Sequence, residues 1–449
     1  MKTIRTKKNM LFILLALLTI SVSTYAQQLS EQQALQNANE FLAKRGRPNK
    51  ISAQKGVRKA KAQNSHEAAY YVFNVGSDEG FVIASGDERT EKILGYSDSG
   101  TFNEENIPDN LRAWLQGYAD QISAIPENYA ASSVSDEIDY PTIEPLIKTK
   151  WGQDAPYNAK CPEVNGQKCP TGCVATALAQ IINYYQYPNT LPAFDATLPG
   201  YDIDWNSIKN EYTASESDEN VAWLMRYCGQ AVDMNYNISG SGANFKYSFV
   251  QKFGYNKYVR YCDRPEYSTK EWHKLLQKEL LASRPVYYTG DPLTYSGAGH
   301  AFICDGCNSD GYYHFNWGWR GSFDGYYLLN ALEPGLGYEF NGDQSIIVGV
   351  QPEEEFVEYK GKITYKNNRI NIDLGNIYYD FPEFNDILQN YELGIAILNS
   401  DGTFNILKSA INNRCSMSVD EIEKSIIESS EGGDVAAITK PVSLSFVSE

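Results

Sequence analysis

A cysteine at the start of an apolar helix is the first candidate for chemistry in this sequence. Cys173 follows Gly172, and apolar residues recur behind it at the spacing of a helix with one buried face, until Pro188 ends the pattern. A thiol at a helix N-terminus faces unpaired N–H groups and the positive end of the helix dipole, and both stabilise a thiolate. The pattern favours a nucleophile, although a lone cysteine in this position is more often a small buried hydrophobic residue.

Of the four histidines, His300 is the best candidate for the base that such a thiol needs. His66 lies in a polar loop outside the domain of the cysteine. His273 is predicted to face solvent from an amphipathic helix, and His314 is typical of a packed structural histidine. His300 instead follows glycines and begins an apolar run, so it can face a cleft while its strand anchors it. We therefore pair it with Cys173.

An asparagine on the next strand is predicted to orient that histidine. If the turn between the two apolar strands centres near Asn308, His300 pairs with Asn316. The asparagine amide oxygen can then accept from one imidazole nitrogen and fix the tautomer, which leaves the other nitrogen for the thiol. Trp317 follows and would shield that hydrogen bond from water. A register shift of one residue would turn Asn316 to the opposite face.

A glutamine ahead of the cysteine supplies a candidate oxyanion donor. Gln153 follows Trp151 and Gly152 at the start of the same domain. Its amide and the backbone N–H of Cys173 would together hold the charge that develops on an attacked carbonyl oxygen. A glutamine alone is normally a surface residue, so this assignment depends on the complete set. The four residue types together are those of thiol-based nucleophilic catalysis.

The first 26 residues have the pattern of a secretory signal. Basic residues precede an apolar run of about 13 residues, and Thr24 and Ala26 offer small side chains at the −3 and −1 positions of a cleavage site. The run is shorter than the roughly 20 residues that a membrane-spanning helix needs. We therefore expect an exported protein without a membrane span, located extracellularly, on the cell surface or in the periplasm.

Residues 27–140 are predicted to form a separate α+β unit without catalytic residues. Ser30 begins a capping box ahead of one helix, a hairpin is predicted around the sequence GSDEG, and Pro108 opens a second helix. The stretch 128–140 is small, polar and without periodicity. It is typical of an exposed linker, which is a preferred site of proteolytic cleavage.

The remainder is predicted to form two further domains. Residues 141–351 place helices first and antiparallel strands later, which is typical of an α+β domain. Residues 352–449 follow a break in composition at Pro-Glu-Glu-Glu and show alternating apolar residues on both sides of a polar turn at 366–369. They predict a small, mostly β domain of unknown role, in which we find no candidate catalytic residue.

The composition excludes several classes of partner. The formal net charge of −17 argues against nucleic acid and against an anionic membrane surface. Eight cysteines are too few for a disulfide scaffold in this length, and the local pairs Cys161/Cys169 and Cys304/Cys307 are left open as disulfides or free thiols. A zinc site would need a clean second pair beside CDGC, so no metal or other cofactor is expected.

Several separate motifs, in matching order and approximate spacing, resemble the streptopain (streptococcal pyrogenic exotoxin B) family of papain-fold cysteine peptidases, close to interpain. They are WGQDAPYN, TGCVATALAQIINYYQYP, VDMNYNISGSG, FGYN, PVYYTG, GHAFICDG and YHFNWGW with the following DGYY. The resemblance covers residues 141–351. Residues 27–140, with VIASGDER and ILGYSDSG, resemble the family's inhibitory propeptide.

This resemblance implies a papain-like catalytic domain of a helical part and an antiparallel β part, made as a zymogen. It implies Cys173 as nucleophile, His300 as general base and acid, and Gln153 as part of the oxyanion hole. The segment ahead of the catalytic domain would be an intramolecular inhibitor. The substrates would be proteins or peptides.

Four further positions are carried over from the family. The resemblance implies that Asn316 orients the catalytic histidine and that Trp317 shields it. It also implies that Ser241 and Gly299 line the substrate cleft, and that the enzyme prefers a hydrophobic side chain two residues before the scissile bond.

Two other classes of function stay open beside a secreted cysteine endopeptidase. One is a catalytically silent peptidase fold that serves as a binding or inhibitor protein, which loss of the cysteine or histidine would have favoured. The other is a different Cys–His enzyme, such as an amidase or transglutaminase, which a cleft closed to extended peptides would favour. The complete set Gln153, Cys173, His300 and Asn316 favours the peptidase.

Overall fold

The computed structural model describes most of the chain up to residue 352 and short segments beyond it. The described residues are 28–48, 50–51, 58–61, 68–126, 138–243, 248–256, 259–290, 300–331, 344–352, 362–367, 369–373, 391–392, 394–398, 404–409, 414–418, 421 and 447–448. The predicted signal, His66, Gly299 and most of the predicted linker lie outside them. Contacts divide the chain into a first unit, Met1–Tyr255 with Cys262–Pro352, and a second, Asn256–Tyr261 with Glu353–Glu449.

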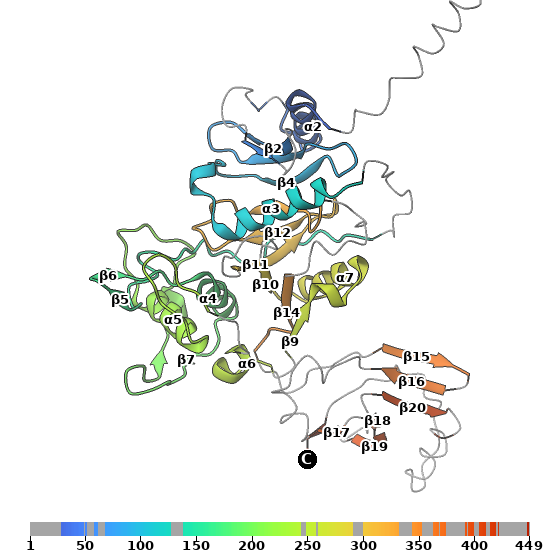
Figure 1. The fold of residues 1–449 in the computed structure, drawn as a ribbon. Helices are drawn as coiled ribbons and strands as arrows, with labels where there is room; N and C mark the ends of the chain where they lie inside the picture. Colours follow the sequence, from blue (N-terminus) through green and yellow to red (C-terminus); the bar gives the residue numbers. More distant parts are fainter. Residues whose placement is uncertain are drawn as a thin grey trace, which may run out of the picture. The chain divides into compact units, whose positions relative to one another are not determined.

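One ten-stranded sheet organises the first unit, in the order β1-β2-β3-β4-β13-β12-β11-β10-β14-β9 (Figure 1). Its strands are β1 Arg58–Lys61, β2 Ala68–Asn74, β3 Phe81–Ser85, β4 Ile93–Ser97, β9 Arg260–Asp263, β10 Val286–Gly290, β11 His300–Cys307, β12 Tyr313–Asn316, β13 Gly325–Tyr327 and β14 Gln344–Val348. The antiparallel strands that the sequence predicts in the later part of residues 141–351 are thereby confirmed.

The helices include the three whose starts the sequence predicts, after Ser30, after Pro108 and at Cys173. They are α2 Glu31–Lys44, α3 Asp109–Ser123, α4 Cys173–Tyr185, α5 Glu219–Ala231, α6 Ser248–Phe253 and α7 Thr269–Leu281, with short 3-10 turns at Glu104–Asn106, Trp205–Ser207 and Arg264–Glu266. Small two-stranded ribbons pair β5 Glu163–Val164 with β6 Gln167–Lys168 and β7 Thr190–Leu191 with β8 Tyr201–Asp202. The capping box at Ser30 and the start of α3 after Pro108 are confirmed.

The N-terminal segment shares its sheet with the segment that follows it. Strands β1 to β4 come from residues 27–140, and β4 pairs antiparallel with β13, with Tyr96 opposite Tyr326 and Gly95 opposite Tyr327. The segment predicted as a separate unit and the segment predicted as the next domain therefore share one continuous sheet. The physical reason is that this pairing satisfies the backbone groups of two edges that separate sheets would leave exposed. The boundary at residue 140 stays a prediction.

A tryptophan from α3 fastens the N-terminal segment to the core of the later strands. The ring centroid of Trp114 lies 4.9 Å from that of Phe315, 5.8 Å from those of Tyr288 and Phe302, and 6.2 Å from that of Trp317. The angles between the ring planes are those of edge-to-face contacts, which aromatic rings prefer. Because Trp114 is only 7 % exposed, it is a core residue for both segments.

Two histidines pack into the fold outside the candidate site, His273 buried and His314 partly buried. His273 is 2 % exposed and its Nδ1 lies 3.0 Å from the Tyr313 hydroxyl, so the prediction that it faces solvent is wrong. The amphipathic pattern of α7 failed here because the helix packs against β10 and β11 over a wider face than its apolar residues mark. The prediction of a packed His314 is confirmed, since its Nδ1 lies 2.6 Å from Asp305 Oδ1.

The cysteines of the two candidate pairs are free thiols. Of the two alternatives left open for Cys161/Cys169 and Cys304/Cys307, the disulfides are thus wrong and the free thiols are confirmed. All four side chains are buried, at 1 % exposure or less.

The second unit is built from strands, as predicted. β15 Lys362–Lys366, β16 Arg369–Asp373 and β20 Arg414–Ser418 form a three-stranded sheet. β18 Gly394–Leu398 pairs with β19 Phe404–Ser409, and β17 Tyr391–Glu392 pairs with β21 Val447–Ser448. The hairpin predicted around 366–369 is confirmed by the pairing of β15 with β16. Among the described residues of the whole chain, no helix has the length and apolarity to cross a bilayer.

Candidate active site

Cys173 is the first residue of α4, and the backbone conformation at position 172 before it requires glycine. Gly172 has φ of 85°, in the left-handed region that side chains disfavour. A Cβ built on it would lie 2.7 Å from the carbonyl oxygen of Ser241. The glycine therefore allows both the turn that presents the thiol and the close approach of the loop that carries Ser241.

The start of β11 lies directly beside the thiol. The backbone N–H of Ala301 donates to Cys173 Sγ across 3.5 Å. His300, the preceding residue and the first of β11, is partly buried. The structure therefore brings the predicted nucleophile and the predicted base to adjacent positions, from elements separated by more than a hundred residues of sequence.

The surroundings of the thiol favour its neutral form. Burial raises the pKa of the Cys173 thiol, and hydrogen bonds from the backbone N–H groups of Ala301, Val174 and Cys173 itself offset this in part. The carboxylate of Asp109, at the start of α3, raises the pKa further. The thiolate stabilisation expected from the helix N-terminus is thus outweighed here, and ionisation of the thiol requires a base.

Gln153 is tied to the segment that leads into α4. Its carbonyl oxygen accepts from the Thr171 N–H at 2.9 Å. The Thr171 hydroxyl lies 2.7 Å from that of Thr176, which in turn donates to the Gly172 carbonyl at 2.9 Å. This chain of contacts fixes the backbone of Gln153 relative to the first turn of α4.

Ser241 lies beside the same turn. Its hydroxyl donates to the carbonyl oxygen of Pro170 at 2.7 Å and accepts from the Asn237 N–H at 3.3 Å. The loop that carries Ser241 is thereby fastened to the residues just before Cys173. Gly299, the other predicted cleft residue, lies outside the described residues.

The hairpin register differs from the one predicted. Asn316 lies opposite Ile303 rather than His300, and the register shifts at a bulge between Cys304 and Gly306. The turn also starts at Asn308 instead of centring on it, because the Asn308 side chain accepts from backbone N–H groups further along the turn. The predicted pairing of Asn316 with His300 is therefore wrong.

The amide of Asn316 joins β12 to α4 and to the segment before Trp151. Its Nδ2 donates to the Thr149 carbonyl at 2.8 Å, and its Oδ1 accepts from Gln180 Nε2 and from the Gly318 N–H, both at 3.1 Å. Gln180 also accepts from the Thr149 hydroxyl at 2.7 Å. Asn316 is 3 % exposed and Gln180 is 1 % exposed, so this is a buried, satisfied network.

Sequence reasoning missed Gln180. Every residue from Val174 to Ile182 is buried, although a helix with one buried face was predicted. α4 is covered on several sides because it packs against α5, β10 and β11. The signal that could have located Gln180 is a polar amide inside an apolar helix, where burial requires a hydrogen-bond partner.

Trp317 lies fully buried beneath the face of β11 that carries His300. Its ring centroid is 4.7 Å from that of Phe302, the next residue on the same face as His300. Its backbone N–H donates to Asp324 Oδ1 at 2.9 Å, and its backbone carbonyl accepts from Asn110 Nδ2 at 3.0 Å. Asn110 belongs to α3, so the N-terminal segment contacts Trp317 directly.

Replacing Asp324 by asparagine is expected to flatten the pH dependence of stability. Burial raises the pKa of Asp324 from 3.8 to about 7, so between these values the folded chain binds more protons than the unfolded chain. Stability contributed by this group is therefore present at low pH and is lost as the pH rises towards 7. At pH 8 Asp324→Asn should raise the melting temperature by roughly 2–5 °C. Thermal unfolding of both proteins between pH 4 and pH 8 checks this, and an unchanged slope would contradict it.

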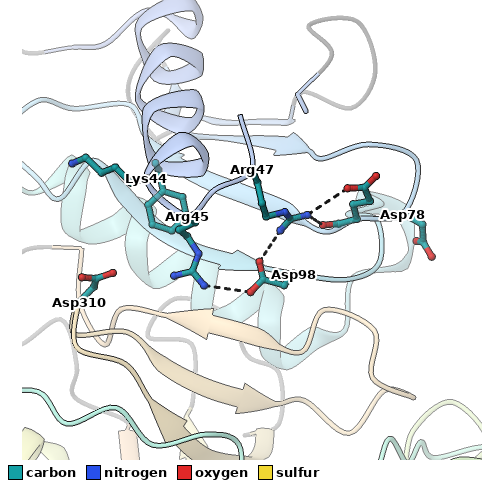
Figure 2. A pocket seen from close by; sticks show the side chains of 8 residues that line it. Lys44, Arg45, Arg47, Asp78, Asp98 and Asp310 are labelled. Atoms are coloured by element: carbon teal, nitrogen blue, oxygen red, sulfur yellow. Dashed lines mark hydrogen bonds and ion pairs between the residues drawn. The ribbon is translucent and has the colours of Figure 1, made fainter. Parts of the chain in front are cut away.

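A separate hollow of about 920 Å³ lies between the N-terminal segment and the turn before β12, and none of the candidate residues lines it. It is lined by Phe41, Lys44, Arg45, Arg47, Asp78, Glu79, Asp98 and Asp310. Figure 2 shows Arg45 and Arg47 directed at Asp98, with N–O distances of 3.4 and 2.7 Å. Both guanidinium groups are thus already paired with a carboxylate of the same lining.

Two family models match the chain. The Peptidase C10 family matches residues 151–327, a range that includes all seven site residues considered above. The Spi protease inhibitor family matches residues 26–122. The second match ends just before the predicted linker.

Curated relatives and a solved structure are similar to more than half of the chain. The thiol protease/hemagglutinin PrtT of Porphyromonas gingivalis is 32 % identical over 77 % of this chain and 44 % of that protein. The chain thus spans less than half of the PrtT sequence. Streptopain of Streptococcus pyogenes is 36 % identical over 63 % of this chain and 80 % of its own length. A prointerpain A fragment of Prevotella intermedia aligns with a TM-score of 0.53 and 30 % identity, over 67 % of this chain and 99 % of the fragment.

Proposed function

The chain belongs to the Peptidase C10 family, and from this premise we propose that it is a cysteine endopeptidase made as a zymogen. The observation that carries the proposal is the position of Cys173, at the N-terminus of α4 with its Sγ against the start of β11. The N-terminal segment that matches the Spi protease inhibitor family would be its propeptide. The four domains would have their boundaries at 26, 140 and 351, and the protein would be exported through residues 1–26.

The proposed reaction proceeds through a thioester. His300 takes the proton of Cys173, whose raised pKa makes a base necessary, and the thiolate attacks the peptide carbonyl carbon. The oxyanion accepts hydrogen bonds from the Gln153 amide and the Cys173 backbone N–H. His300 then protonates the leaving amine, and water hydrolyses the thioester to release the acid.

Supporting roles are proposed for the residues around this pair. Trp317 would keep water from His300, which its packing against Phe302 on the same strand face supports. Asn316 would support the site from behind, because its buried amide ties β12 to α4 through Gln180 and to the Thr149 carbonyl. Ser241 and Gly299 would line the cleft, with a preference for a hydrophobic side chain two residues before the scissile bond.

The proposed inhibition by the N-terminal segment has support at two points. Asn110 donates to the carbonyl of Trp317, and the carboxylate of Asp109 disfavours the Cys173 thiolate. Both residues lie at the start of α3, so removal of α3 would take away a negative charge near the thiol. The segment would therefore be held against Trp317 by Asn110, while Asp109 adds a small opposition to ionisation of the nucleophile.

Incubation of purified chain 27–449 in mild reductant tests the proposed function. We expect a cut within residues 128–140, followed by digestion of an unfolded protein substrate. Iodoacetamide should stop both and should modify Cys173, while the fully buried Cys228 serves as the internal control for nonspecific alkylation. A chain that neither trims itself nor cleaves substrate, even after another protease has removed the N-terminal segment, would favour the binding-protein alternative.

A further inference from the structure

Arg320 lies across the segment that carries Gln153. Its backbone N–H donates to the Trp151 carbonyl at 2.9 Å, and its Nη2 donates to the Ala155 carbonyl. These two acceptors stand on either side of Gln153 in the sequence. One residue from the loop after β12 therefore holds both ends of the short segment on which the candidate oxyanion donor lies.

The guanidinium group is itself fixed at two further points. Its Nη1 donates to the Tyr212 carbonyl at 2.9 Å, and its central carbon lies 5.1 Å from the ring centroid of Tyr157. The rings of Tyr157 and Tyr212 meet edge to face at 5.8 Å. A planar guanidinium group can donate to carbonyls of two segments while it stacks on a ring. The ammonium group of lysine cannot, so lysine would not replace arginine here.

The fit between Arg320 and the segment is close. A Cβ built on Gly152 would lie 2.8 Å from Arg320 Cγ, so the glycine leaves the room that the arginine stem occupies. Arg320 itself has φ of 57°, an unfavourable conformation for a residue with a side chain. Residues in this region persist where surrounding contacts hold them, and such positions cluster at functional sites.

We propose that Arg320 is a positioning residue for the oxyanion hole. The proposal rests on the proposed function, and in particular on the role of Gln153 as a donor. The segment from Trp151 to Ala155 is held on one side by Arg320 and on the other by the Thr171 N–H, which donates to the Gln153 carbonyl. Thr171 leads directly into α4, so Arg320 sets the Gln153 backbone against the first turn behind Cys173.

The contacts of Arg320 with the Gln153 segment are expected to stabilise the transition state of the reaction. A donor to a developing oxyanion stabilises the transition state more than the bound substrate, and small displacements of it are costly. A loosened segment should therefore lower kcat and leave KM nearly unchanged. A purely structural role would instead lower the amount of folded enzyme.

The variants Arg320→Lys and Arg320→Gly test the proposal. Lysine keeps the charge and loses the fork, whereas glycine keeps the backbone N–H bond to Trp151 and suits the positive φ. Tagged wild-type enzyme removes the N-terminal segment from each variant and is then itself removed through its tag. The concentration of active sites is measured by alkylation. We expect kcat on a short peptide to fall about tenfold to a hundredfold in both, with KM within about twofold. The alkylation rate of Cys173, which needs no oxyanion hole, should stay unchanged.

A double-mutant cycle with Gln153→Ala tests whether Arg320 affects kcat through Gln153. If Arg320 acts through Gln153, Arg320→Lys should cause little further loss in the Gln153→Ala background. Addition of methylguanidine should restore part of the kcat of Arg320→Gly. Any of three results would overturn the proposal. The first is a wild-type kcat in Arg320→Lys, and the second is an equal loss of kcat from Arg320→Lys in the wild-type and Gln153→Ala backgrounds. The third is loss of folded protein in both Arg320→Lys and Arg320→Gly. An inactive wild-type chain would instead overturn the proposed function.

Discussion

Cys173→Ala is expected to abolish both self-trimming and substrate cleavage, with a fall in rate of about 10⁴-fold or more. The reason is that no thioester can form without the sulfur, and neither the oxyanion donors nor His300 can replace it. The change removes one atom from a partly exposed residue at the first turn of α4, so the fold should be unaffected. Peptide hydrolysis and gel analysis of the 27–449 chain measure the loss, and circular dichroism checks the fold.

A second cysteine provides the matched control for that loss. Cys228 lies on α5, is fully buried, and is a free thiol like Cys173. Cys228→Ala should therefore trim itself and cleave substrate at close to the wild-type rate. Residual cleavage by Cys173→Ala in a preparation without other proteases would show that the nucleophile is a different residue.

Trp114→Ala is expected to be the most damaging change in the N-terminal segment. It empties a site within the cluster formed with Tyr288, Phe302, Phe315 and Trp317, and should lower the free energy of unfolding of the zymogen by about 3–5 kcal/mol. Because the same ring joins α3 to the later strands, the uncut chain should also become active earlier. Chemical denaturation of the zymogen in a Cys173→Ala background measures the first effect, and a lag-time assay measures the second.

Two further variants separate loss of packing from general damage. Trp114→Phe keeps an aromatic ring in the cluster, so its effect should be smaller. Leu281→Ala removes an apolar side chain that is 65 % exposed and should leave both stability and lag time unchanged. A Trp114→Ala zymogen with wild-type stability and lag would mean that α3 is held mainly by other contacts.

Local patterns predicted the elements of the site well. The apolar spacing after Cys173 and the glycine before it are short-range signals, and α4 begins where they place it. The glycine-to-apolar transition at His300 likewise marks the start of β11. The starts of α4 and β11 are both determined by residues close to them in the sequence, so they can be predicted from local patterns.

Long-range features were beyond the same reasoning. The bulge after Cys304 shifts the register between β11 and β12 and so changes the residue opposite Asn316. The local sequence pattern did not predict this bulge. The pairing of β4 with β13 joins strands that are far apart in sequence. Gln180 and Arg320 gain their roles only from partners on other segments, so their residue types alone do not mark them.

The sheet shared by the N-terminal segment and the later strands has a consequence for any cut between residues 126 and 138. Such a cut breaks the chain but leaves the β4–β13 hydrogen bonds and the aromatic contacts of Trp114 in place. The two fragments then become separate molecules in an association equilibrium, and their effective concentration for one another drops from that of a tether to that of the solution. Release of the N-terminal fragment would therefore depend on dilution, so that a concentrated sample stays latent after cleavage and a dispersed one does not.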